Sequence, residues 1–85
     1  MNEYISHKTI MLLVNNGYKI HDTFAQKSIR DGKAFIGIIS IMFVPEIRVI
    51  ASLIDTLVDI QECKVLKDEL ESVIKLLNKI KEEEK

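Results

Sequence analysis

The sequence predicts a small, mostly helical domain that ends in a long helix. Three observations lead to this fold class: a length of 85 residues, apolar residues at helical spacing in most segments, and no Gly or Pro after Pro45. A chain of this length buries only about 60–65% of its unfolded surface, so oligomerisation is a usual way to complete its core. We interpret residues 1–85 as one domain, with a helical core over 1–60 and an amphipathic helix over 61–85 for oligomerisation or partner binding.

The first predicted helix covers about residues 3–16. Its apolar residues precede the sequence Asn15-Asn16-Gly17. Glycine takes the left-handed conformation after a helix without a Cβ penalty. The helix is therefore expected to end near Asn16.

The segment from about 23 to 41 has two interpretations. Thr23 and Gln26 fit a capping box, which predicts helices at 22–31 and 34–44. The second of these has Phe35, Ile38, Ile39, Met42 and Phe43 at helical spacing. The alternative is an α+β fold with a hairpin at about 23–41, turning at Arg30-Asp31-Gly32-Lys33. Because Thr23 to Ile29 shows no convincing alternation, the helices are preferred.

A long helix is predicted from Glu46 to about Glu83. Pro45 suits its first turn, and the residues up to Ile60 are apolar all round. Beyond this point, coiled-coil spacing predicts an interface formed by Leu66, Leu70, Val73, Leu77 and Ile80. Unbroken, the helix would be about 57 Å long, too long for a compact globule of this size. An unbroken helix would therefore protrude and contact a partner. The alternative is that the helix breaks near 59–64.

A nucleic-acid contact is a second possibility, although the net charge is −1. The cations concerned are Lys19, Lys27, Arg30 and Lys33, which follow one another with few acidic residues between them. A helix-turn-helix would then place a recognition helix at Thr23 to Arg30.

Catalysis, cofactors and metals are not expected. His7, His21 and Cys63 lie at no recognised metal-binding spacing. Asp55 and Asp59 share a helical face but lack a third ligand. Each histidine has a possible catalytic partner only beside it in sequence, Ser6 for His7 and Asp22 for His21. Such neighbours rarely have the geometry of a catalytic triad, so the chain is interpreted as a non-enzymatic protein.

Membrane insertion is also disfavoured. The apolar run from Ala34 to Ile54 includes Glu46 and Arg48, each costing roughly 2.5–3.5 kcal/mol inside a bilayer. The first residues lack the features of a signal peptide, and a single cysteine fits a reducing compartment. A cytoplasmic location is therefore predicted.

The predicted function is stoichiometric binding. The small size and the Ile- and Lys-rich composition resemble the accessory proteins of bacteriophages and mobile elements, a resemblance that assigns no residue a role. We expect a protein–protein interaction or regulatory module, dimeric through its C-terminal helix. The alternatives are a dimeric nucleic-acid-binding regulator and a membrane-associated factor.

Overall fold

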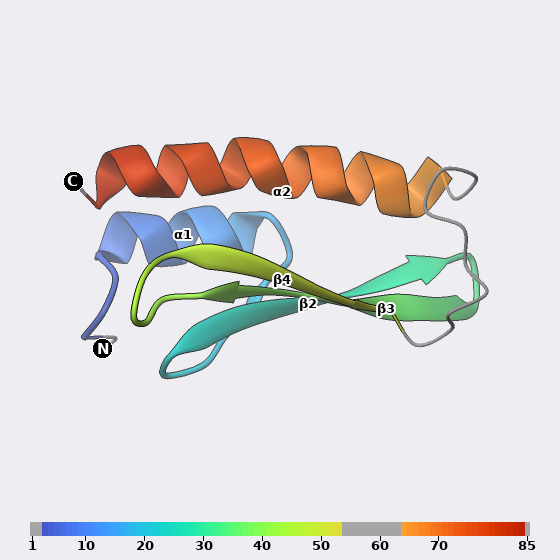
Figure 1. Ribbon diagram of the computed structural model, residues 1–85, viewed down its shortest axis with the longest axis horizontal. Helices are drawn as coiled ribbons and strands as arrows, with labels where there is room; N and C mark the ends of the chain where they lie inside the picture. Colours follow the sequence, from blue (N-terminus) through green and yellow to red (C-terminus); the bar gives the residue numbers. More distant parts are fainter. Residues whose placement is uncertain (1–2, 54–63, 85) are drawn as a thin grey trace.

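The computed structural model describes residues 3–53 and 64–84 and shows an α+β fold, with two helices on one side of a four-stranded antiparallel sheet (Figure 1). The strands lie in the order β1-β2-β3-β4. The elements are α1 (His7–Asn15), β1 (Lys19–Ile20), β2 (Phe24–Asp31), β3 (Ala34–Met42), β4 (Arg48–Leu53) and α2 (Lys64–Glu83). The prediction of a mostly helical fold is wrong, and the α+β alternative describes the class correctly.

Helix α1 is present, and it ends where the sequence predicts. Its N-cap is Ser6, whose side chain accepts a hydrogen bond from the backbone N–H of Thr9. At the other end, Gly17 has φ +86° and donates to the carbonyl of Val14, while Tyr18 donates to the carbonyl of Leu13. This is a Schellman motif, in which glycine takes the left-handed position.

The helices predicted at 22–31 and 34–44 are wrong, because these residues form the β2–β3 hairpin. Gly32 has φ +61° and Lys33 does not have positive φ, as expected for a two-residue type II′ turn. Strand β3 is central and has apolar residues on both faces, with Ile39 and Ile41 fully buried and Ile38 half-buried. Such a strand is a nearly continuous apolar run, which can also match helical spacing.

Strand β4 replaces the start of the predicted long helix. Pro45 lies in the connection between β3 and β4 rather than in a first helical turn. A Cβ at Gly37 would collide with the backbone carbonyl oxygen of Ser52, so a residue without a side chain lets the two strands approach. The helix prediction is thus wrong over Arg48–Leu53. The continuation through 54–63, including the predicted break near 59–64 and Asp55, Asp59 and Cys63, lies outside the described residues.

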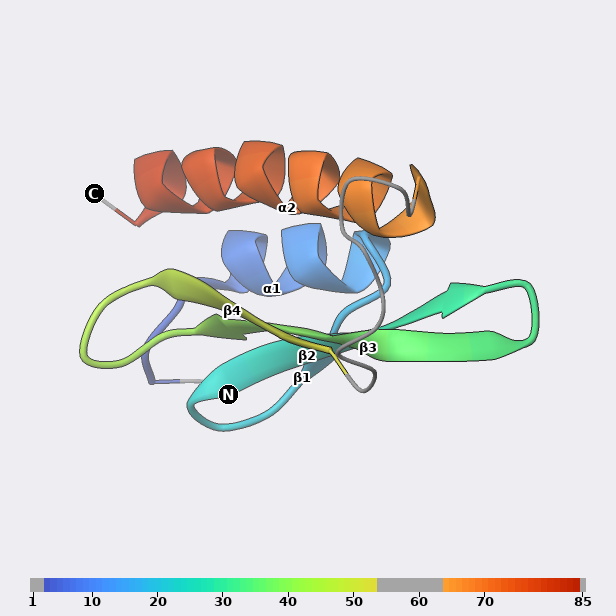
Figure 2. The same ribbon diagram turned by 45° about the vertical axis from the view of Figure 1, so that its right-hand side comes forward.

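Helix α2 packs on the sheet and on α1, and both views place the two helices on the same side (Figures 1 and 2). Its buried residues are Leu66, Val73, Leu76 and Ile80. The coiled-coil prediction is therefore wrong. The 4-3 spacing marks the apolar stripe of an amphipathic helix that packs on α1 and the sheet of its own domain, so no helix from another molecule is needed to bury it.

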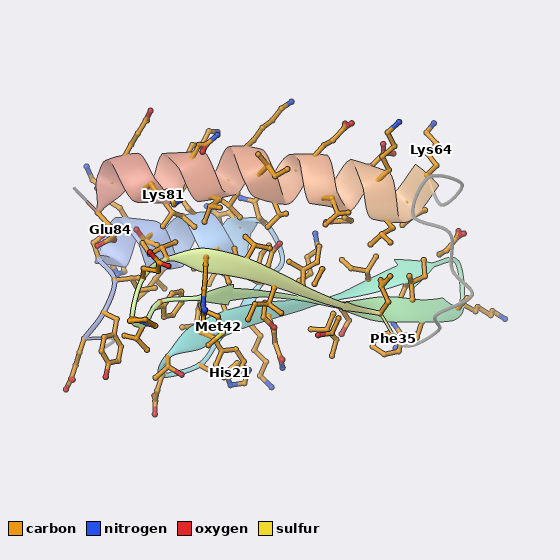
Figure 3. The ribbon with its side chains drawn as sticks, viewed as in Figure 1. His21, Phe35, Met42, Lys64, Lys81 and Glu84 are labelled. Atoms are coloured by element: carbon orange, nitrogen blue, oxygen red, sulfur yellow. The ribbon has the colours of Figure 1, made fainter. Side chains whose placement is uncertain are left out.

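The end of α2 is tied to the start of α1. The Glu84 carboxylate accepts hydrogen bonds from the Ser6 backbone N–H, at 2.7 Å, and from the Thr9 hydroxyl. Burial disfavours the charged form, but these hydrogen bonds outweigh it and lower the pKa of Glu84 below its ordinary value. Figure 3 shows Glu84 at the end of α2, beside the first turn of α1. The two helices therefore run antiparallel and are fixed at one end.

Candidate functional site

The sheet has two faces of different character. Side chains alternate between them along each strand, and paired residues share a face. The inner face, under the helices, comprises Ile20, Ala25, Lys27, Ile29, Gly37, Ile39, Ile41, Val49, Ala51 and Leu53. The outer face comprises Lys19, Phe24, Gln26, Ser28, Arg30, Phe35, Ile38, Ser40, Met42, Arg48, Ile50 and Ser52. No described element covers the outer face, which makes it the candidate functional site.

Cations occupy the margins of the outer face. Lys19 stands opposite Gln26 on the edge strand β1. Arg48 stands opposite Met42 on the other edge strand, β4. Arg30 stands opposite Phe35 near the β2–β3 turn. Among the strand residues described on this face, none is Asp or Glu. The face is therefore positive, although the whole chain has a net charge of −1.

Two pairs of side chains, each with at least one aromatic ring, lie at opposite ends of the outer face and are called the aromatic pairs below. Near one end, the rings of His21 and Phe24 stack with centroids 4.5 Å apart and planes inclined by 18°. Near the other end, the Arg30 guanidinium lies 5.3 Å from the centre of the Phe35 ring. His21 and Phe35 both lie on the side of the sheet away from the helices (Figure 3).

Polar and apolar side chains fill the space between the aromatic pairs. Gln26 and Ser40 form one cross-strand pair there, and Ser28 and Ile38 form the next. Ile50, beside Ser40 on β4, is 42% exposed. The centre of the face thus offers hydrogen-bonding groups together with accessible apolar surface.

Lys27 has a different environment, on the inner face. Its Nζ atom lies 3.1 Å from each carboxylate oxygen of Glu69 on α2 and 5.8 Å from the centre of the Tyr18 ring. Burial of Tyr18, assisted by the negative charge of Glu69, raises the pKa of this phenol to about 12. Lys27 therefore joins the sheet to a helix and is held away from the outer face.

The predicted nucleic-acid residues are thus divided by the structure. Lys19 and Arg30 lie on the outer face, Lys27 lies on the inner face, and Lys33 lies in the turn between β2 and β3. Because 24–31 is a strand, the predicted recognition helix is wrong.

Sequence reasoning placed Phe24 among the cations of a possible basic patch, but it did not assign Arg48, Phe35 or His21 to a binding site. A signal was present for part of the outer face: from Phe24 to Arg30, every second residue belongs to it.

The predicted interface residues of α2 already have partners within the chain. Leu66, Val73 and Ile80 are buried, and Leu70 and Leu77 pack against the same core. Another molecule would reach Leu66, Val73 and Ile80 only if α2 left the sheet, whereas Leu70 and Leu77 are half-buried.

Other site types are not formed by the part of the chain that the structure describes. Within residues 3–53 and 64–84, no group of three or more His, Cys, Asp or Glu side chains is arranged to hold a metal ion. Neither of the two described helices has the length and apolar character needed to cross a membrane.

Comparison with protein-family models, with curated proteins and with solved structures finds no match to this chain. The outer face of the sheet is therefore interpreted from its own chemistry.

Proposed function

We propose that this protein is a non-enzymatic module that acts by stoichiometric binding, and that it binds an anionic partner through the outer face of its sheet. One observation carries the proposal: the outer face combines the exposed Ile50 and half-buried aromatic rings with Lys19, Arg30 and Arg48, and its described strand residues include no carboxylate. A cytoplasmic location, which a single cysteine fits, is part of the proposal.

The charge of the outer face argues against a second copy of the chain as its partner. Two such faces in contact would bury cations from both copies, and the described strand residues of the face supply no carboxylate to pair with them. Burying unpaired charges is costly. The expected homodimer through α2 is not supported either, because its apolar stripe packs within the chain.

Retention on a polyanion tests this proposal without assuming the identity of the partner. The wild-type protein is expected to bind heparin at low salt. Replacing Lys19 and Arg48 with Gln should lower the salt concentration needed for elution, because both cations lie on the outer face and are exposed. Circular dichroism of each variant checks that the fold is retained.

The matched control removes the same charge from the opposite side of the molecule. Lys67→Gln with Lys75→Gln alters two exposed residues of α2 and should elute close to the wild-type position. Equal elution shifts for the two double variants, or no retention of the wild-type protein, would overturn the proposal.

A further inference from the structure

We infer that the partner of the outer face is single-stranded nucleic acid, bound by base stacking at the two aromatic pairs and by phosphate contacts at the cationic margins. This inference rests on the proposed function and names the ligand class of the same surface. Proteins that bind single strands combine positive charge along the backbone path with aromatic side chains on which bases stack.

The stacking groups are half-buried rings on the outer face, and the Arg30 side chain beside Phe35 is exposed. His21 and Phe24 already form a two-ring stack, which a base can extend by one further ring. At the other end, Arg30 lies over Phe35 in the arrangement through which a guanidinium adds cation–π energy to a stack. Aromatic or guanidinium planes in these positions accept any base, since every base has a π-face.

The spacing of these groups fits a short strand. Phe24 and Arg30 are six positions apart on β2, which corresponds to about 20 Å along an extended strand. A single strand that reaches both aromatic pairs therefore has about four nucleotides or more, the lower end of known site sizes. Gln26, Ser28 and Ser40 lie between the pairs and offer hydrogen bonds to bases, sugars or phosphates.

Duplex DNA fits this face less well. Its major groove is about 12 Å wide and admits a helix or a two-stranded ribbon. The outer face spans four strands, or about 14 Å between the outermost strand axes before side chains are added. A sheet of this width contacts a flexible single strand with its bases exposed, and is too wide to enter a groove.

The small size of the face favours nucleic acid over a protein partner. About 14 Å by 20 Å is a small footprint beside the roughly 800 Å² per partner of a standard protein–protein interface. A few stacked bases can bind on a small surface, because each base–aromatic stack contributes its own share of the binding free energy.

Fluorescence anisotropy with labelled oligonucleotides tests the inference. The intact protein should bind a twenty-nucleotide single strand of thymidine or uridine more tightly than a duplex of equal length, and more tightly than a dinucleotide. Affinity should fall as salt increases. Phe24→Leu and Phe35→Leu remove a ring but keep an apolar side chain, and each should weaken single-strand binding about tenfold.

Met11→Leu is the matched control, since it changes an exposed apolar residue of α1, away from the outer face, with little change in volume and without removing a ring. Its affinity should stay within about twofold of the wild-type value. Preference for duplex, or unchanged affinity in both Phe variants, would overturn the inference.

The same experiment separates this inference from the proposed function. Retention on heparin that depends on Lys19 and Arg48, without measurable binding of single strands, would reject nucleic acid and leave an acidic protein as the partner. If replacing Lys19 and Arg48 did not change the elution from heparin, the outer face would be rejected as the binding surface altogether.

Discussion

The inner and outer faces of the sheet are formed by the same strands, but the described helices pack only on the inner face, and the two faces differ in charge. On β3, Ile39 and Ile41 face the helices and are almost fully buried, whereas Ile38 and Ser40 between them are half-buried on the opposite face. The inner face includes one lysine of β2, and this lysine is paired with Glu69. The outer cations have no carboxylate among the strand residues described beside them. The comparison shows that the helices bury one face of the sheet, while no described helix covers the other.

The largest expected effect compares isoleucines from the two faces. Ile41→Ala should lower the free energy of unfolding by about 2–5 kcal/mol, because this fully buried side chain leaves a cavity. Ile50→Ala on the outer face should cost less than about 1 kcal/mol, since the side chain is already 42% exposed. Urea denaturation followed by circular dichroism measures both. Equal losses would contradict the assignment of the faces.

A smaller effect concerns the contact that keeps the helices over the inner face. Glu84→Gln should cost about 1 kcal/mol near neutral pH, because the partly buried hydrogen bonds from Ser6 and Thr9 lose their charged acceptor. Glu83→Gln is the matched control: Glu83 lies 3.8 Å from the exposed Lys8, and its loss should have little effect. Denaturation midpoints of the two variants give the comparison.

The Glu84 contribution should depend on pH in a defined direction. Its pKa is lowered in the folded state, so the stabilisation is complete above the ordinary carboxyl pKa of about 4.3. The stabilisation declines as pH falls through the lower folded value. The difference between wild type and Glu84→Gln should therefore shrink below about pH 4. A difference that stays constant down to pH 3 would contradict this linkage.

The last effect, confined to alkaline pH, tests the burial of Tyr18 beside Lys27. Burial, with help from Glu69, raises its folded pKa to about 12, so the neutral phenol stabilises the fold below the ordinary pKa of about 10. This stabilisation is lost as pH rises from about 10 toward 12. Between pH 8 and pH 11, the free energy of unfolding should therefore fall less for Tyr18→Phe than for the wild-type protein. Urea denaturation at the two pH values measures this difference. Tyr4→Phe, at a tyrosine that is 47% exposed, should behave like wild type.

Local signals in the sequence were sufficient for the end of α1 and for the amphipathic character of the C-terminal helix. The stop at Gly17 depends on residues within one turn, and the predicted C-terminal amphipathic helix is observed as Lys64–Glu83. The chemistry of Lys19 and Arg30 as exposed cations was also predictable from the sequence. These features depend on near neighbours along the chain, which a sequence shows directly.

The strands and the composition of the outer face were decided by tertiary structure. Residues 34–42 suit a helix by spacing and a central strand by composition, and their pairing with β2 and β4 selects the strand. The same pairing brings Arg48 to the face that carries Lys19 and Arg30. The sequence by itself determined which segments are apolar and where α1 stops. Only the tertiary structure decided which face the helices cover, because strand pairing and helix docking depend on residues far apart in the chain.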